Sequence, residues 1–451
     1  MASELRQLAR FLSGLRYEDL PEKVVRSAKM CLLDTIASAI GGVHNAQVKN
    51  VTDVYLKLAG DNGRIKLWGR EHCAPLLTAV FLNGLMGHTL EMDDVHTASK
   101  SHIGVVVIPA AWGLAQQLNS SGKELLLAIV CGYEAMSRIG MALGVSSHRN
   151  KGWHVTGTAG TFGAAAACAK LLGLDEEHTL SALGLAGTQS SGLWAFLADG
   201  ASCKVLHTGR AACSGCEAAL LADAGMTGPE HILTAADGGL LAAMSDEYDI
   251  SKVCAGLGEK WEILQLDNKP YPCCRSTHCT IDAALELRDR GIKPEDIAHI
   301  VVDTYLVGNK QCGMSEGSRK PKNPVDAKFS TPFTVACALL YGQVTLKEFL
   351  PENIGNEEVQ DLLSRVSVRT DEHLTEEYPA HWGCRLTATL RDGRQENCFV
   401  RDASGSVSNP LSEEQLCAKA TALLAEAYGD GASAIAKTIL SVDSWDTLPP
   451  I

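Results

Sequence analysis

Three short polar stretches in an otherwise apolar chain hold residues suited to acid–base chemistry. The first, "LEMDDVHTASKSHIG", contains Asp93, Asp94 and His102. The second, "GWHVTGTAG", places His154 before a Gly-rich helical pattern, and the third, "DGASCKVLHTGRAA", places Lys204 near a helix start. An imidazole can give or take a proton near neutral pH, and a carboxylate can orient that imidazole. These residue types predict a site for proton transfer.

A fourth stretch, "DNKPYPCCRSTHCT", adds Lys269, Arg275 and His278. Removing a proton next to a carboxylate builds negative charge on a group that is already anionic, so such a site needs cations. Lys204, Lys269 and Arg275 could supply them. Spacing alone leaves open whether the four stretches meet, because an isolated histidine or lysine is most often solvated or structural.

Other chemistries have weaker support. Two sets of residues offer metal-ligating side chains: Asp93, Asp94, His96 and His102, and Cys273, Cys274, His278 and Cys279. Neither has the paired spacing of a structural zinc site, so we expect no metal. The C-x-x-C at Cys213–Cys216 lacks a preceding strand, "GTAGTFG" is not a phosphate-binding loop, and no G-x-S-x-G elbow is present.

Composition and charge limit the classes of partner that the protein is expected to bind. The 451 residues carry a formal charge of −13, which disfavours nucleic acid and anionic membrane surfaces as partners. The 16 cysteines are scattered through Ala/Leu-rich segments and are expected to be reduced and buried. No secretory signal or membrane-spanning run is apparent. We expect a cytoplasmic protein, or a mitochondrial-matrix protein if the source is eukaryotic.

The chain pattern predicts two domains. Helical periodicity dominates residues 1–265 and returns in 401–451, which predicts one large all-helical domain built from both ends of the chain. Residues 266–400 predict a smaller α+β domain with strands at 299–307 and 362–368. A hairpin is expected around Asp392-Gly393. Asp175 and Ser412 are expected to cap helices.

Several motifs, in order along nearly the whole chain, resemble the MmgE/PrpD family. The matching stretches are "GHTLEMDDVH…SHIGVVVIPA", "GWHVTGTAGTFG", "DGASCKVLHTGRAA", "KPYPCCRSTHCTIDAAL" and "NPLSEEQL". The resemblance implies a mainly helical domain with an α+β lid, a cleft between them, and a homodimer. It also implies cofactor-free, metal-independent chemistry on a small polycarboxylate. "VHTASKS" departs from the family's usual Thr- and Pro-rich form, which makes that loop a candidate for setting substrate choice.

The resemblance also implies roles for individual residues. The family's catalytic positions fall on Asp93 or Asp94, His102, His154 and Lys204, and a further active-site position falls on Lys269. Lys269 is expected to bind substrate, as are Arg275 and His278 in the matched lid motif.

The family runs several reactions with one set of residue types, so the residues do not separate them. A hydro-lyase of the dehydratase type is our first expectation. An epimerase or isomerase of a dicarboxylate such as iminodisuccinate is second, and a cis-aconitate-type decarboxylase is third. A non-catalytic relative that only binds a metabolite is the alternative outside enzymes.

Overall fold

The structure is a computed structural model that describes residues 2–60, 62–449 and 451. The chain divides into two compact units. Unit 1 contains the chain up to Trp194, then Lys204–Leu266 and Ser412–Ile451. Unit 2 contains Ala195–Cys203 and Asp267–Leu411.

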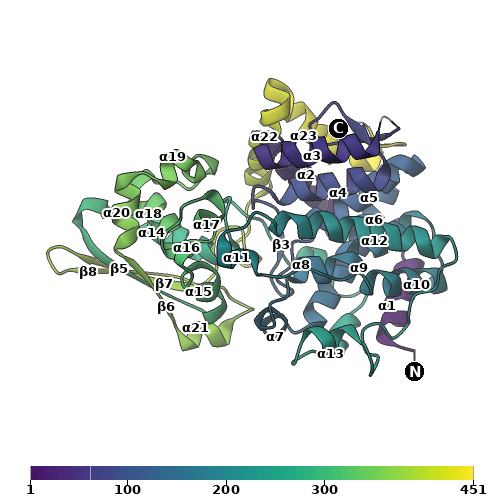
Figure 1. The fold of residues 1–451 in the computed structure, drawn as a ribbon, viewed down its shortest axis with the longest axis horizontal. Helices are drawn as coiled ribbons and strands as arrows, with labels where there is room; N and C mark the ends of the chain where they lie inside the picture. Colours follow the sequence, from purple (N-terminus) through teal and green to yellow (C-terminus); the bar gives the residue numbers. More distant parts are fainter. Residues whose placement is uncertain (1, 61, 450) are drawn as a thin grey trace. The chain divides into compact units, whose positions relative to one another are not determined.

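Unit 1 is helical, as predicted, and its helices pack as a multilayered bundle (Figure 1). Its α-helices are α1 (Glu4–Gly14), α2 (Glu22–Gly41), α3 (Ala46–Ala59), α4 (Leu76–His88), α5 (Gly104–Leu118), α6 (Gly122–Ala142), α7 (Val145–Asn150), α8 (Val155–Thr158), α9 (Gly160–Leu171), α10 (Glu176–Gly187), α12 (Lys204–Asp223), α13 (Leu240–Met244), α22 (Glu413–Tyr428) and α23 (Ala432–Leu440). Two short strands, β1 (Ile65–Lys66) and β2 (Cys73–Ala74), form an antiparallel ribbon.

Glycines let the core helices approach closely where the polar stretches attach. A Cβ on Gly209 of α12 would lie 2.5 Å from the carbonyl oxygen of Phe81 in α4. A Cβ on Gly84 of α4 would lie 3.2 Å from the Cα of Gly209. The two helices therefore cross backbone to backbone. Since His88 follows Gly84 by one turn, this crossing brings the end of α4 to the start of α12.

The two ends of the chain meet within unit 1. Figure 1 shows α22 and α23, coloured yellow, beside α2, coloured purple. Lys419 of α22 makes a 2.7 Å ion pair with the buried Asp34 of α2. Its ammonium also donates to the carbonyl oxygen of Met92 at 2.5 Å. Helix α22 therefore stabilises the segment that carries Asp93 and Asp94.

One described helix, α6, is long and apolar enough to cross a membrane by length and composition. Its most apolar window is 94% buried inside the protein, where it packs against α9 and α5. The helix carries Glu134 and Arg138, which form a buried ion pair with each other at 2.9 Å. These contacts are those of a core helix.

Unit 2 is an α+β structure, as predicted. Its sheet has the order β6 (Val366–Thr370), β5 (Ile297–Thr304), β7 (Cys384–Leu390) and β8 (Gln395–Val400). β5 pairs parallel with β6 and antiparallel with β7. Helices α14 (His278–Asp289) and α18 (Thr331–Tyr341) pack on the sheet and bury its apolar side chains. The remaining helices are α11 (Phe196–Asp199), α15 (Leu306–Cys312), α16 (Glu316–Arg319), α17 (Pro324–Lys328), α19 (Pro351–Ile354), α20 (Glu357–Ser364) and α21 (Glu372–Glu377).

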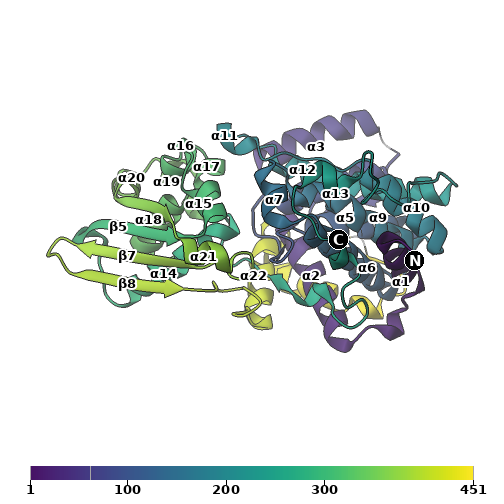
Figure 2. The ribbon, with the colours of Figure 1, turned by 90° about the horizontal axis from the view of Figure 1, so that it is seen from below.

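Several local predictions are confirmed. Asp175 and Ser412 cap α10 and α22 through their side chains. The hairpin joins β7 to β8 (Figure 2), and Gly393 adopts the positive φ of 87° that its turn requires. The cysteines are free thiols and most are buried, although Cys73 and Cys203 are exposed.

Other boundaries differ from the prediction. The strand predicted at 362–368 begins at Val366, because Val359, Leu362 and Leu363 form the buried face of α20. The strand predicted at 299–307 ends at Thr304, and Leu306 begins α15. The chain returns to unit 1 after Leu411, where the prediction placed the change at 400/401. Residues 195–203 belong to unit 2 although nothing in their composition sets them apart.

The α4–α12 crossing predicts the cost of adding one methyl group. Gly209→Ala should lower the stability of the protein by about 1–2 kcal/mol, because overpacking outweighs the gain in helix propensity. Gly14→Ala is the matched control, since its Cβ would meet nothing within 4 Å and it also lies in a helix. Thermal unfolding of both variants measures the difference. A Gly209→Ala protein as stable as Gly14→Ala would contradict the close approach.

Candidate active site

One buried carboxylate, that of Asp93, organises two imidazoles. Nδ1 of His88 lies 2.9 Å from both carboxylate oxygens of Asp93. Nδ1 of His102 lies 2.9 Å from Oδ2 of Asp93 and 3.1 Å from the carbonyl oxygen of Asp94. Every one of these partners is an acceptor, so Nδ1 of each ring must carry the hydrogen. The neutral form of each ring then has its lone pair on Nε2, which is the nitrogen able to take a proton.

The backbone around this carboxylate is held at both ends. His88 is the last residue of α4, and His102 comes shortly before α5. The backbone N–H of His102 donates to Oγ1 of Thr156 in α8 at 3.1 Å. The "His-Val-Thr-Gly" stretch therefore helps to orient His102 as well as carrying His154.

A buried ion pair lies beside the two imidazoles. Nζ of Lys204, at the start of α12, is 2.5 Å from Oε1 of Glu91, and both side chains are 7% exposed. Oε1 of Glu91 is also 3.4 Å from Nε2 of His88. Glu91 has a φ of 60°, a left-handed conformation that costs a non-glycine residue energy. Strain of this kind is tolerated where surrounding contacts hold a side chain in a required position.

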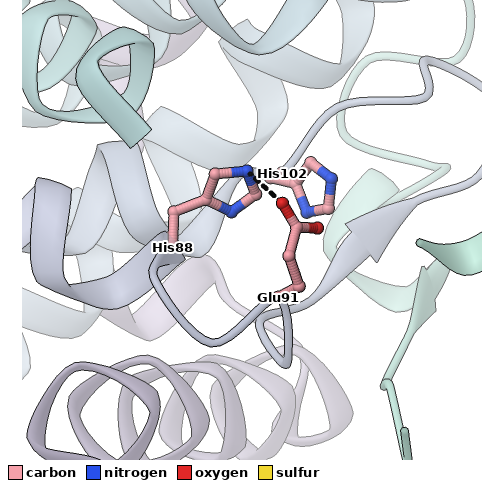
Figure 3. Close-up of side chains that lie close together, drawn as sticks. All are labelled: His88, Glu91 and His102. Atoms are coloured by element: carbon pink, nitrogen blue, oxygen red, sulfur yellow. Dashed lines mark ion pairs between the residues drawn. The ribbon is translucent and has the colours of Figure 1, made fainter. Parts of the chain in front are cut away.

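Within the part of the chain that the structure describes, the group of side chains that could hold a metal ion is His88, Glu91 and His102 (Figure 3). One ligand atom from each lies within 4.8 Å of the others. The ammonium of Lys204 already neutralises the Glu91 carboxylate. A divalent cation at this trio would have to bind next to that ammonium, and like charges at such short range repel.

The adjacent aspartate has different partners. Asp94 accepts hydrogen bonds from the hydroxyl of Tyr133 at 2.6 Å and from the backbone N–H of Gly104 at 2.9 Å. Asp94 therefore ties α6 to the start of α5. A Cβ on Gly104 would lie 2.8 Å from the Tyr133 hydroxyl, so this position requires glycine. Burial raises the pKa of Asp94 from its ordinary value of 3.8 to about 7.

His154 lies in the same unit, with its ring between two others. Its Nδ1 is 2.9 Å from Nδ1 of His207, and the Trp194 ring meets it edge to face with centroids 4.9 Å apart. Burial, the paired ring of His207 and the nearby ammonium of Lys204 lower the pKa of His154 well below its usual value. His154 is therefore neutral at physiological pH.

The predicted substrate-binding residues lie in unit 2. Arg275 is buried and its Nε donates to Asp267 at 2.9 Å, which also accepts from the backbone N–H of Val407. Lys269 is fully buried. The buried His278 begins α14, and its ring meets Tyr271 edge to face. Arg275 thus has a structural ion pair whatever else it binds.

Among the predicted catalytic residues, Asp93, His102 and Lys204 gather around Glu91 and His88, and His154 lies within electrostatic range of them. Sequence reasoning had not assigned roles to His88, Glu91 and His207. Spacing along the sequence could have pointed to two of these residues, His88 and His207. His88 ends a buried helix five residues before Asp93, and His207 shares a helix face with Lys204 at i+3.

Sequence comparison covers both units. The MmgE/PrpD N-terminal domain profile matches residues 6–252, and the MmgE/PrpD C-terminal domain profile matches residues 271–444. The predicted resemblance is therefore confirmed over most of the chain.

Individual relatives are similar over nearly their whole lengths. The chain is 27% identical to a cis-aconitate decarboxylase of Aspergillus terreus (strain NIH 2624 / FGSC A1156), over 99% of this chain and 94% of the relative. It is 29% identical to the cis-aconitate decarboxylase of Homo sapiens, over 90% and 84%. It is 23% identical to a 2-methylcitrate dehydratase of Cupriavidus necator, over 92% and 86%.

The Tyr133–Asp94 contact predicts that Tyr133→Phe lowers the stability of the protein by an amount that depends on pH. Because the folded-state pKa of Asp94 lies above its ordinary value, its favourable contribution to stability is complete below about pH 4. That contribution is lost as the pH rises through about 7. Tyr133→Phe removes a hydrogen bond that matters most once the carboxyl is ionised. We expect a cost of about 1 kcal/mol at pH 5 and about 2–3 kcal/mol at pH 8.

Urea unfolding at the two pH values measures this difference. Tyr248→Phe is the control, because Tyr248 is 48% exposed. An equal cost for Tyr133→Phe at pH 5 and pH 8 would show that the hydroxyl does not serve an ionisable Asp94.

Proposed function

Because the chain belongs to the MmgE/PrpD family, we propose that it is a metal-independent lyase acting by acid–base chemistry on a small polycarboxylate. The observation that carries this proposal is the buried cluster in which Asp93 orients two imidazoles beside the Lys204–Glu91 ion pair. Such a cluster combines groups that move a proton with a cation that can stabilise developing negative charge.

The residues of unit 1 take distinct roles in this proposal. Lys204 stabilises the carboxylate on which charge accumulates, and His102 and His154 exchange protons with the substrate. Asp93 holds His102 in the tautomer whose Nε2 can act as a base. Asp94, with its hydrogen bonds to Tyr133 and Gly104, is a positioning residue. Lys269, Arg275 and His278 stay predicted substrate-binding residues, and the homodimer stays a prediction.

The names of the relatives change the order of the candidate reactions. From the sequence alone we expected dehydration first. The fungal and human relatives at 27% and 29% identity are cis-aconitate decarboxylases, and the dehydratase relative is 23% identical. We therefore propose decarboxylation of a cis-aconitate-like tricarboxylate first and dehydration of a citrate-like one second.

Both reactions use the same groups. In decarboxylation the C–CO₂ bond breaks, its electron pair delocalises towards a remaining carboxylate near Lys204, and an imidazolium or neutral N–H delivers the replacing proton. In dehydration one imidazole removes the C–H proton and the other protonates the departing hydroxyl. Epimerisation would require proton exchange on both faces of one carbon.

A substrate panel separates these reactions. The protein is incubated with cis-aconitate, 2-methylcitrate and iminodisuccinate in heavy water, with and without a chelator. NMR and mass spectrometry follow carbon dioxide, water loss and deuterium uptake together. We expect carbon dioxide release with one deuterium incorporated, unaffected by chelator. Binding of these compounds with no turnover or exchange would favour a non-catalytic relative, and strong inhibition by chelator would contradict metal independence.

The ion pair gives a separate prediction for Lys204. Lys204→Met leaves the buried Glu91 carboxylate without its cation and should cost about 3–5 kcal/mol of stability. The double variant Glu91→Gln/Lys204→Met should recover most of that stability. Both variants should lose at least about a hundredfold in kcat, because the cation is absent in each.

Thermal unfolding and turnover of the two variants measure this separation. Lys252→Met, at a side chain that is 53% exposed, is the control for loss of a lysine. Turnover in the double variant close to that of the unmodified protein would overturn the role of Lys204.

A further inference from the structure

Two histidines of unit 1 form a direct ring-to-ring hydrogen bond. Nδ1 of His154 and Nδ1 of His207 are 2.9 Å apart, and their ring centroids are 5.1 Å apart. His154 is 1% exposed, whereas His207, one turn into α12, is only partly buried. A buried imidazole is thus joined to one that reaches towards the surface.

The local backbone holds this pair tightly. The backbone N–H of His154 donates to the carbonyl oxygen of Gly192 at 3.0 Å. A Cβ on Gly192 would lie 3.2–3.3 Å from Cγ and Nδ1 of His207, and Gly192 has a φ of 118° that favours glycine. On its other side the His154 ring meets Trp194. The two rings therefore have little freedom to turn away from each other.

Burial and the groups that face the pair favour the neutral form of both rings. His207, Lys204, His88 and His102 face His154. Lys204 and His88 face His207, and the Arg149 guanidinium lies over the neighbouring Trp194 ring. Burial, and after it these neighbours, lowers the pKa of His207 to about 4 and that of His154 well below its usual value. Two neutral rings joined through Nδ1 must differ in tautomer, because one Nδ1 donates and the other accepts.

We propose that His207 sets the tautomer of His154 and relays its proton to solvent, so that the pair switches His154 between base and acid. When Nδ1–H of His154 donates to His207, Nε2 of His154 has a lone pair and acts as a base. When Nδ1–H of His207 donates to His154, Nε2 of His154 carries the hydrogen and acts as an acid. His207 is a positioning and relay residue that acts through His154.

In each cycle the relay transfers one proton from the substrate to water. Nε2 of His154 takes a proton from the substrate, and the hydrogen on Nδ1 of His154 crosses the 2.9 Å contact to Nδ1 of His207. His207, briefly cationic, releases the hydrogen on its Nε2 to water. Both rings end neutral with their tautomers exchanged, and the reverse sequence delivers a proton from water to the substrate. This inference rests on the proposed function, because it assumes that His154 exchanges a proton with substrate.

Nitrogen-15 NMR of the full chain labelled at histidine tests the pairing without any substrate. The 14 histidines are distinguished by loss of signals in His154→Gln and His207→Asn. At pH 7 we expect both rings to be neutral, with a hydrogen shared between their Nδ1 atoms. Two rings that each carry their hydrogen on Nε2 alone, or a cationic ring at pH 7, would overturn the proposal.

Turnover and chemical rescue test the relay itself. His207→Ala should lower kcat by about 10–100-fold with KM changed less than about twofold, since acid–base groups contribute on this scale. Added imidazole should raise the kcat of His207→Ala by at least about tenfold, because His207 is only partly buried and imidazole can reach its place. His207→Asn, whose amide replaces Nδ1, should fold normally yet stay slow. Leu206→Ala on the same helix, at a side chain 40% exposed, is the matched control and should keep full activity.

The outcomes distinguish this inference from the proposed function. If His154→Gln keeps full turnover, the proposed role of His154 is wrong. If His154→Gln loses turnover while His207→Ala or His207→Asn keeps the unmodified kcat, only the relay is wrong. Should His207→Ala fail to fold, His207→Asn and the NMR of the unmodified protein still decide.

Discussion

The buried ion pair between Lys204 and Glu91 is the constraint on which the rest of unit 1 depends. A charge removed from water is tolerated only when an opposite charge lies against it. Lys204 begins α12 and Glu91 follows α4, so the pair exists only if those helices approach closely. Gly84 and Gly209 permit that approach, because a side chain on either would meet the other helix. These two core glycines are therefore required for the ion pair as well as for close helix packing.

Around this pair, each polar group has a partner that limits its freedom. Asp93 holds two imidazoles by Nδ1, and Asp94 ties the following helix to Tyr133. Lys419 of α22 donates to the carbonyl oxygen of Met92, directly before Asp93. Supporting contacts of this kind keep reactive side chains in position, which acid–base chemistry requires. Through Lys419, the segment that returns to unit 1 after unit 2 is one of these supports.

The elements that sequence patterns predicted best are those whose local signals agree with their packing. The caps at Asp175 and Ser412 are side chains that accept hydrogen bonds from their own helix starts, and the hairpin turn at Gly393 joins two strands adjacent in sequence. Prediction was weaker where one apolar, β-branched run covers the end of a helix and the start of the next strand. Val359, Leu362 and Leu363 lie on a helix face that packs against α18, and the strand begins only at Val366. Whether these residues form helix or strand depends on their packing against α18, which is distant in sequence.

The sequence by itself determined the family, the mainly helical character of unit 1, the α+β character of unit 2, and the residue types available for proton transfer. Each of these follows from periodicity or from motifs read along the chain. Only the tertiary structure decided which aspartate meets the imidazoles, that His88 and Glu91 belong to the cluster, and that His207 pairs with His154. The reason is physical: neighbouring residues such as Asp93 and Asp94 point to different partners, and those partners lie on helices that meet only when the chain folds.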